Sequence, residues 1–427
     1  MWRLYNTTNM LCKKSDYVFR GHFSFFWNLD TIDFYNTQQI FIFVNKIIAM
    51  KNYYPEIPSP AFILEEKLLR RNLEKLSSVS KEAGVSIILA LKGYALWKSF
   101  PLVRQYLAGA TASSLAEAKL CVDYMGSKAH TFAPVYAPEE FDEIARCSSH
   151  ITFNSLSQFE KYKAVCKQYG ISVGLRVNPG YSDVTTEMYN PCSPNSRLGI
   201  PASELADGLP DGVDGIHFHA LCENDSYSLE RVLKSFEERF GHLLSSAKWV
   251  NMGGGHLITH KDYKPEHVIQ LLKDFKKKYD VAVILEPGGA VGWQTGVLKA
   301  RVLDIVNYGE NPTAILDVSF AAHMPDTLEM PYRPNVRDAF SEKTENCFAY
   351  RLGGNSCLAG DFMMPYYFKE QLHVGDTIIL EDMMHYTMVK TTTFNGVTHP
   401  SIWIEHEDGT DECIRKFGYA DFRDRLS

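Results

Sequence analysis

The sequence predicts an eight-stranded α/β barrel followed by a domain rich in β-strands. Between residues 85 and 286, short apolar runs alternate with helical stretches, and eight of these runs end 19 to 41 positions apart. After about residue 295, helical periodicity becomes scarce and strand-like runs separated by turn residues take over. A strand-then-helix repeat is what a (β/α)₈ barrel requires, whereas a cluster of strands indicates a separate domain.

The predicted domains follow from these changes along the chain. Residues 50–294 are predicted to form the barrel and residues 295–427 the β-rich domain. Residues 1–49 lack clear periodicity, and they also lack the charged start and cleavage site of a secretory signal. Met50 opens a stretch that looks like a natural start. We therefore expect residues 1–49 to be an extension outside the fold.

The predicted barrel begins with an apolar run at residues 85–91 that ends on Lys92. This run is too short for a helix and too continuous for a strand with one wet face, so it predicts a parallel strand covered on both sides. The other predicted strands end near Ser113, Val135, Asn154, Asn178, His219, Gly253 and Glu286. A doubly wound open sheet is the alternative, but no GxGxxG follows the first strand.

Composition narrows the classes of partner and compartment. The formal net charge of −7 argues against nucleic-acid and anionic-membrane partners. The nine cysteines include no CxxC pair, so they indicate reduced thiols in a cytoplasmic protein and no zinc site. No apolar run approaches the ~18 residues of a membrane span.

Lys92 is the first candidate for chemistry, because the carboxyl ends of buried strands are where α/β proteins place their active sites. A lysine in a dry site loses hydration, deprotonates more readily and can form an imine with an aldehyde. The alternative is a surface lysine at a strand–loop junction. The residues at the other strand ends disfavour that alternative.

Glycines end the seventh strand and follow the eighth. The run Gly253, Gly254 and Gly255 can close backbone N–H groups around a phosphate, and a following helix N-terminus would favour its negative charge. Gly288 and Gly289 can add donors to the same phosphate. Phosphate sites recur at late strands of such barrels, which strengthens an otherwise weak motif.

Glu286, at the end of the eighth strand, needs a cationic or N–H partner if it is buried. A pyridinium nitrogen would supply one, and a salt bridge to Arg176 is the alternative. In GIHFH, His219 is better placed than His217 to stack on an aromatic cofactor, and His217 is expected to be a hydrogen-bonded core residue. Cys357 lies between glycines in a predicted loop, which favours a chemical role over a packing role.

This constellation resembles the pyridoxal-phosphate enzymes of the alanine racemase fold (fold type III), and among them the basic amino acid decarboxylases. It is most similar to the carboxynorspermidine/carboxyspermidine decarboxylases, over roughly residues 55–405. The motifs that carry the resemblance are ALKGY, RVNPGYSDVTTEMYNPCSPNSRLGI, HFHALCEN, NMGGGH, LEPGGAVGWQTG, HMPDTLEMPYRP, CLAGD and HYTMVKTTTFNG.

The resemblance implies pyridoxal 5'-phosphate (PLP) as cofactor and a role for each matching residue. Lys92 would form the imine, His219 would stack on the ring and Glu286 would pair with the ring nitrogen. The phosphate would be held by Gly253, Gly254, Gly255, Gly288, Gly289 and the hydroxyl of Tyr386. The implied electron sink favours decarboxylation over racemisation.

The resemblance also implies a homodimer with shared active sites, in which Cys357 of one subunit protonates the carbanion in the other. Asp326, Glu329 and Asp361 are the nearest carboxylates for the amines of a carboxylated polyamine substrate. The implied reaction gives norspermidine or spermidine in polyamine biosynthesis. The alternatives are another decarboxylase of this fold, ornithine- or diaminopimelate-like, and a catalytically inactive regulatory homologue.

Two positions depart from related enzymes. Gly289 stands where ornithine-type relatives have arginine and carboxynorspermidine enzymes commonly have an acid, so a substrate-facing side chain is expected to be missing. Leu358 follows Cys357 where ornithine and diaminopimelate decarboxylases carry an acid. This second departure argues against both of those small substrates.

Overall fold

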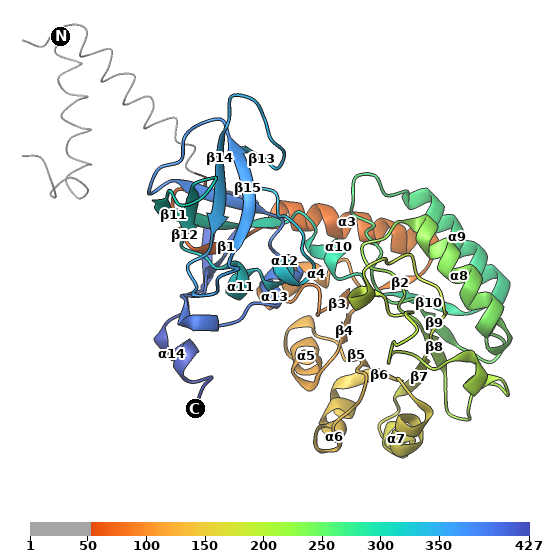
Figure 1. Ribbon diagram of the computed structural model, residues 1–427. Coiled ribbons are helices and arrows are strands. Elements are labelled where there is room, and N and C mark those ends of the chain that lie inside the picture. Colours follow the sequence, from red (N-terminus) through yellow and green to blue (C-terminus); the bar gives the residue numbers. More distant parts are fainter. Residues whose placement is uncertain (1–52) are drawn as a thin grey trace, which may run out of the picture. The chain divides into compact units, whose positions relative to one another are not determined.

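Two β-sheets organise the part of the chain that the computed structural model describes, residues 53–427 (Figure 1). The predicted extension at residues 1–49 lies outside the described residues. The first sheet is wholly parallel and the second is mixed.

The parallel sheet closes into the predicted barrel. Its first strand is split by Ile88 into two short halves, one of which pairs with the last strand and the other with the next strand along the chain. The Ile88 N–H donates to the Leu285 carbonyl and the Leu89 N–H to the Gly109 carbonyl, so both edges are bonded. The strands are β2 (Ser86–Ile87), β3 (Leu89–Ala90), β4 (Ala110–Ala112), β5 (Ala129–Phe132), β6 (Ser148–Phe153), β7 (Ser172–Arg176), β8 (Gly215–His217), β9 (Trp249–Asn251) and β10 (Ala282–Leu285).

Trp249 fills the amino end of the barrel. It is the first residue of β9, and its indole lies where side chains from β8 and the next strand, β7, would otherwise project. A Cβ on Gly174 or Gly215 would come within 2.3 Å and 2.1 Å of the indole, so only glycine fits at both positions. With its amino end filled, the barrel leaves its carboxyl end open for a site.

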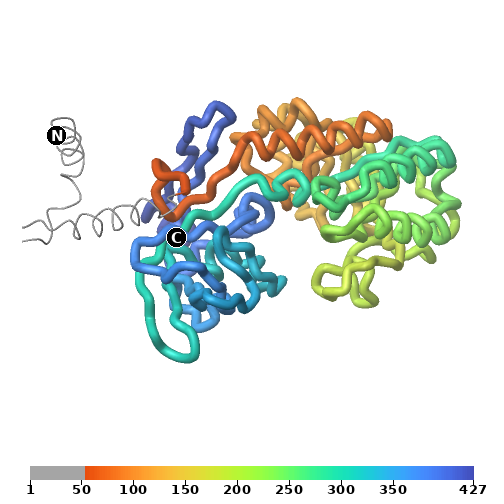
Figure 2. The backbone as a smooth tube through the Cα atoms, turned by 90° about the horizontal axis from the view of Figure 1, so that it is seen from above, coloured from red at the N-terminus to blue at the C-terminus, as the bar shows by residue number. Residues whose placement is uncertain are grey.

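Helices cover the outside of the barrel (Figure 2). They are α3 (Glu66–Ala83), α4 (Phe100–Val103), α5 (Leu115–Leu120), α6 (Pro138–Cys147), α7 (Leu156–Gln168), α8 (Ser226–Phe240) and α9 (Pro265–Tyr279). The short helix α10 (Gly289–Gly292) follows the last barrel strand. The connection from β7 to β8 has only short 3₁₀ turns, because prolines and glycines interrupt it. No helix among residues 53–427 is long and apolar enough to cross a membrane.

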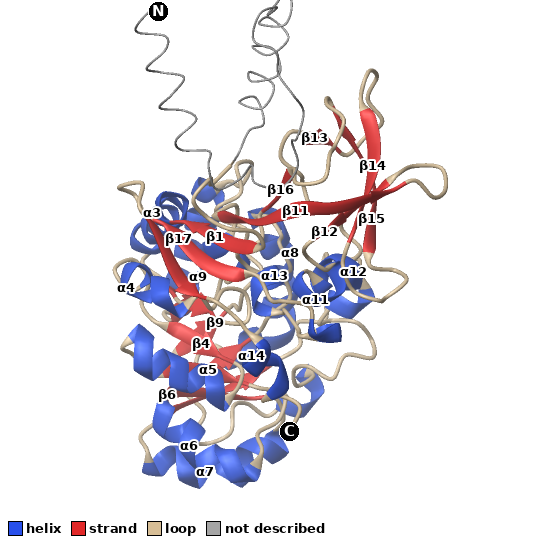
Figure 3. Cartoon of the chain, turned by 90° about the vertical axis from the view of Figure 1, so that its left-hand side faces the viewer, coloured by secondary structure: helices blue, strands red, loops and turns tan. Residues whose placement is uncertain are grey.

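Most strands of the second sheet follow the barrel in sequence, as predicted, but the first strand of this sheet precedes the barrel (Figure 3). Its strands are β1 (Ala61–Glu65), β11 (Gly296–Val306), β12 (Thr313–Leu316), β13 (Ala339–Phe340), β14 (Phe348–Gly353), β15 (Phe362–Phe368), β16 (Thr377–Glu381), β17 (Ser401–Glu405) and β18 (Asp411–Arg415). Four short helices accompany them, α11 (Phe320–His323), α12 (Pro325–Glu329), α13 (Tyr386–Val389) and α14 (Tyr419–Arg423).

The predicted barrel range 50–294 needs correction at its start. β1 pairs antiparallel with β11 and parallel with β17, so it belongs to the second sheet. Its residues are apolar on both faces, and sequence alone gives no sign of which sheet they join. The chain therefore enters the second sheet, passes through the barrel and returns.

Candidate active site

A cavity at the carboxyl end of the barrel, which we call the lysine pocket, brings together three of the predicted residues, Lys92, His219 and Glu286. Each follows the end of its strand by one or two residues, which is why strands far apart in sequence deliver them to one place. The pocket is lined by Ala90, Lys92, Thr111, Ser113, Phe132, Pro134, Arg176, His217, His219 and Glu286.

Lys92 is surrounded by protein, yet solvent reaches its side chain through the cavity. Desolvation by the surrounding protein, followed by repulsion from Arg176, lowers the pKa of the amine. Its Nζ lies 3.4 Å from Nε2 of His219. Since His219 Nδ1 accepts the Gly254 N–H at 3.1 Å, the neutral ring carries its proton on Nε2, facing the amine. This arrangement favours the uncharged, nucleophilic amine.

Glu286 is buried and held by one amide. Its Oε1 accepts a hydrogen bond from Nδ2 of Asn251 at 2.7 Å, and burial raises the pKa of the carboxyl. Arg176 forms no ion pair with it among the described residues; its guanidinium lies over the Phe132 ring at 4.6 Å and donates to the His219 carbonyl at 3.4 Å. The predicted alternative, a Glu286–Arg176 salt bridge, is therefore absent.

His217 lies beside Glu286 in the core, 3.9 Å from its carboxylate. Burial lowers the pKa of His217 well below its ordinary value, so this pair is not ionic. Neither ring nitrogen has a hydrogen-bond partner among the described residues, so the expected hydrogen-bonded core histidine is wrong in that respect.

A second cavity, which we call the glycine pocket, lies on the other side of His219. It is lined by His219, Leu221, Cys222, Glu223, Gly255, His256, Leu257, Gly288, Gly289, Ala290 and Tyr386. Burial raises the pKa of the Tyr386 hydroxyl, which keeps its proton available for donation. Four of the six predicted phosphate residues, Gly255, Gly288, Gly289 and Tyr386, thus share one pocket with His219, whereas Gly253 and Gly254 line neither pocket.

The three glycines at the end of the seventh strand have different structural roles. Gly253 donates its N–H to Asn251 Oδ1 at 2.9 Å and Gly254 donates to His219, so these two position other site residues. Gly255 has a φ of +87°, and a Cβ there would lie 2.1 Å from the Leu221 carbonyl oxygen. Helix α9 begins only at Pro265, so the predicted helix N-terminus behind these glycines is wrong.

Gly289 opens space in the glycine pocket. A Cβ at this position would meet only Tyr386, at 3.6 Å, and Glu223, at 4.0 Å. The sequence departure therefore leaves room beside the predicted phosphate donors, within the glycine pocket and outside the lysine pocket. On the neighbouring turn, Asn72 donates to the carbonyls of Val291 and Trp293 and so fixes the chain that leaves the pocket.

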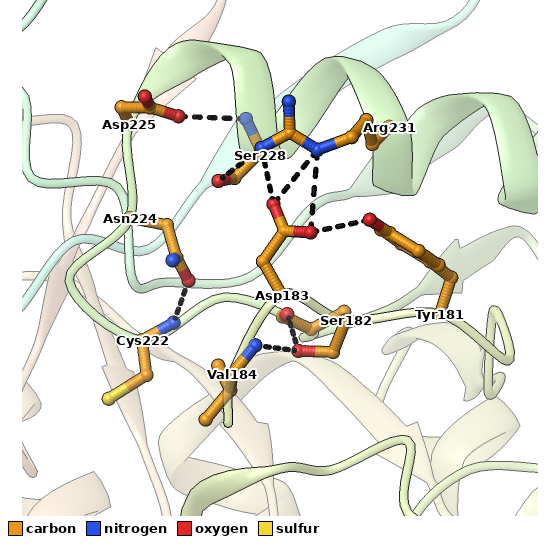
Figure 4. Close-up of polar contacts among 10 residues, drawn as sticks. Tyr181, Ser182, Asp183, Val184, Cys222, Asn224, Asp225, Ser228 and Arg231 are labelled. Atoms are coloured by element: carbon orange, nitrogen blue, oxygen red, sulfur yellow. Dashed lines mark hydrogen bonds and ion pairs between the residues drawn. The ribbon is translucent and has the colours of Figure 1, made fainter. Parts of the chain in front are cut away.

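The loop after β7 is tied to α8 beside these pockets (Figure 4). Asp183 accepts from Arg231 at 2.6 Å and from the Tyr181 hydroxyl at 2.5 Å. Although partial burial opposes it, these hydrogen bonds lower the pKa of Asp183 to about 2. Ser182 donates to the Ala220 carbonyl at 2.7 Å. The loop is thereby fixed next to the strand end that carries His219.

The carboxylates predicted to bind substrate differ in their burial and in their hydrogen-bond and ion-pair partners. Asp326 is buried; its Oδ2 accepts from Tyr332 at 2.8 Å and Thr387 at 2.7 Å, while Oδ1 has no partner among the described residues. Glu329 is exposed and paired with Lys390. Asp326 therefore has one buried oxygen without a partner among the described residues, and it lines neither pocket.

Asp361 is committed to the loop that carries Cys357. Its carboxylate accepts from the Ala321 N–H at 3.0 Å, the Ser356 N–H at 3.2 Å and the Ser356 hydroxyl at 2.5 Å. The Cys357 N–H donates to Asn395 Oδ1 at 2.8 Å, and its side chain is exposed. Cys357 lines neither pocket of its own chain.

Several residues of the site were missed by sequence reasoning. The sequence suggests Arg176 only as an ion-pair partner of Glu286. Its place at the end of β7 is the feature that could have marked it as a residue of the pocket. Glu117 accepts the Ser113 N–H at 2.6 Å and acts electrostatically on Lys92, but it lies on a helix and had no signal. Glu223 and His256 follow predicted site residues in sequence, and only the fold shows that they line the glycine pocket.

The residues present fit PLP. The amine of Lys92, the ring of His219 and the buried carboxyl of Glu286 surround one pocket, and the adjoining pocket has the N–H groups of Gly255, Gly288 and Gly289 and the Tyr386 hydroxyl. No hydrogen bond joins those three N–H groups to a described residue. The space at Gly289, which any side chain would enter, completes a cradle for an anionic group.

Comparison with known proteins agrees with this geometry. The family described as "Pyridoxal-dependent decarboxylase, C-terminal sheet domain" matches residues 17–384. A carboxyaminopropylagmatine decarboxylase from Synechocystis is 49% identical, over 87% of this chain and 96% of the relative. A carboxynorspermidine/carboxyspermidine decarboxylase from Campylobacter jejuni is 47% identical, over 87% of this chain and 99% of the relative.

A solved structure agrees as well. The crystal structure of carboxynorspermidine decarboxylase from Campylobacter jejuni, complexed with norspermidine, superposes with a TM-score of 0.81 at 45% identity. The match covers 86% of this chain and all of that one. The resemblance predicted from the motifs is thereby confirmed, and with it the fold class and the expectation of a carboxy-lyase. This chain belongs to the pyridoxal-dependent decarboxylases.

Proposed function

We propose that this chain decarboxylates carboxynorspermidine or carboxyspermidine to norspermidine or spermidine, with PLP as cofactor and as a homodimer with shared active sites. The observation that carries the proposal is the lysine pocket, where Lys92, His219 and Glu286 meet beside a cradle for a phosphate. The similarity over nearly the whole length of the Campylobacter relative supports the substrate class.

Each residue has a distinct task in the proposed reaction. When bound, PLP supplies an electron sink for the bond broken at Cα of the substrate. The amine of Lys92, whose pKa is lowered by burial, would hold the cofactor at its aldehyde carbon. Glu286, which lacks a cation in its buried site, holds the proton on the pyridine nitrogen. His219 provides the flat surface on which the ring rests.

The last step needs a proton at Cα. Among the described residues, the thiol that lines either pocket is that of Cys222, in the glycine pocket. We therefore keep Cys357 of the partner subunit as the donor. Asp361 and Asn395 hold the loop that presents it. We therefore assign Asp361 to holding this loop and not to the predicted contact with the substrate.

A second substrate is favoured by a specific observation. The Synechocystis relative named for carboxyaminopropylagmatine is 49% identical to this chain. That compound ends in a guanidinium group where carboxyspermidine ends in an ammonium group. Both are carboxylated polyamines, so the free oxygen of Asp326 would serve either one.

Initial rates with purified, PLP-loaded protein test the proposal. We expect kcat/KM for carboxynorspermidine, carboxyspermidine or both to exceed that for ornithine and diaminopimelate by at least ~10²-fold, since a buried carboxylate left unpaired by a short substrate is costly. Carboxyaminopropylagmatine is measured alongside. A preference for ornithine or diaminopimelate would overturn the assigned substrate class.

Asp326→Asn should raise KM for the carboxylated polyamine about 10- to 100-fold, because it removes the charge that pairs with a substrate cation. Asparagine still accepts the hydrogen bonds from Tyr332 and Thr387, so the melting temperature should change little. Glu329→Gln is the matched control and should have a smaller effect, since Glu329 is exposed and already paired with Lys390. An unchanged KM in Asp326→Asn would remove this residue from the substrate site.

A further inference from the structure

The glycine pocket contains one buried polar side chain that no other part of the site uses. His256 follows the third glycine of the seventh strand end and is 1% exposed. Neither of its ring nitrogens makes a hydrogen bond to a described residue. The carbonyls of Met252 and Gly253 lie near enough to the ring to raise its pKa, although neither contact meets the geometry of a full hydrogen bond. A buried imidazole with two idle nitrogens needs a partner.

Hydrogen bonds fix the backbone on both sides of His256. The Gly255 carbonyl accepts the Asn224 N–H at 2.9 Å, and the Leu257 N–H donates to the Asn224 carbonyl at 3.1 Å. The main chain of His256 is therefore held between two hydrogen bonds to Asn224. A fixed main chain limits the positions that the buried ring can take, which lowers the cost of binding a ligand.

The lack of cationic side chains in the described part of the glycine pocket also favours His256 as a phosphate ligand. Among the described residues that line the glycine pocket there is no lysine or arginine. Gly289 leaves space, and Glu223 places a carboxyl in the pocket that would repel an anion if it were ionised. The N–H groups of Gly255, Gly288 and Gly289 and the Tyr386 hydroxyl are donors for a phosphate here, and the buried His256 ring can add a further N–H.

We propose that His256 is a phosphate ligand in this pocket, donating an imidazole N–H to the phosphate of PLP. The inference rests on the proposed use of PLP. Burial lowers the pKa of His256 to about 4, so the ring is neutral before the phosphate binds and has one N–H to give.

Comparing PLP with pyridoxal, which lacks the phosphate, isolates this contact. In His256→Phe, which keeps a ring but removes both nitrogens, the dissociation constant for PLP should rise about 10- to 100-fold. The constant for pyridoxal should change less than about threefold, because the lost partner is absent from that ligand. His256→Gln restores an N–H donor and should recover most of the affinity for PLP.

His217→Phe is the matched control. His217 is also a buried histidine without hydrogen bonds, but it lines the lysine pocket beside Glu286, so its loss should affect PLP and pyridoxal alike. Affinities are followed by the absorbance of the lysine-bound ligand. Equal losses for both ligands in His256→Phe would overturn the role of His256 and would leave the proposed function standing, since wild-type binding and turnover are measured in the same series.

A crystal structure of the wild-type protein with PLP covers the case in which His256→Phe does not fold. The expected result is a ring nitrogen of His256 within about 3.2 Å of a phosphate oxygen. A ring whose nitrogens contact only water or backbone would contradict the proposal.

Discussion

Lys92→Ala is expected to abolish the absorbance of lysine-bound PLP and to lower turnover by at least ~10²–10⁴-fold, because alanine has no amine to bond to the cofactor or to move protons. The effect is large because Lys92 is the one lysine that lines the lysine pocket. Burial also lowers the pKa of this amine, which favours the uncharged form.

The matched control for this prediction is Lys98→Ala. Lys98 lies six residues further on, is exposed, and places its amine over the Trp97 ring at 4.8 Å outside both pockets. Its removal should leave both absorbance and turnover near wild type. If Lys92→Ala retains the absorbance of a lysine-bound cofactor, the covalent link is at another lysine and the assignment of the site fails.

Mixing two inactive variants, Lys92→Ala and Cys357→Ala, is expected to restore activity. Lys92→Ala and Cys357→Ala should each be almost inactive, because one lacks the amine and the other the proton donor. If Cys357 acts across the subunit interface, exchange of subunits gives heterodimers in which one of the two sites is intact. With random pairing half of the dimers are heterodimers, so about a quarter of wild-type activity should return.

Cys413→Ala provides the control, since Cys413 is also exposed and lies on β18 of the second sheet. It should be active alone, and mixing with it should add nothing beyond its own activity. If the Lys92→Ala and Cys357→Ala mixture stays as inactive as its components after subunit exchange has been demonstrated, then Cys357 acts within its own subunit or has no part in catalysis.

The barrel could be predicted because its strands leave a strong local signal. Each is a short apolar run that ends on a polar or glycine residue, and strand ends from Lys92 to Glu286 are gathered at one rim by the closure of the sheet. Lys92, His219 and Glu286 could be identified for the same reason. These three residues are chemically distinctive, and each closely follows a strand that the sequence predicts.

The features that could not be predicted depend on contacts between distant segments. β1 joins the second sheet through pairing with residues 232 to 340 positions away, and its apolar sequence suits either sheet. Asp361 reads as a free carboxylate until the fold places Ala321 and Ser356 around it. His256 follows a glycine motif and gives no hint, in sequence, that its ring is buried without a partner.

The central claim, that this chain cleaves the carboxyl group from Cα of a carboxylated polyamine and replaces it with one proton, is tested most directly in D₂O. Purified, PLP-loaded protein is incubated with carboxynorspermidine and with carboxyspermidine, and the CO₂ and the amine product are quantified by mass spectrometry. The account predicts one CO₂ for each molecule of norspermidine or spermidine, with one carbon-bound deuterium at the former Cα. Deuterium in recovered substrate without release of CO₂ would show racemisation in place of decarboxylation and would contradict the account.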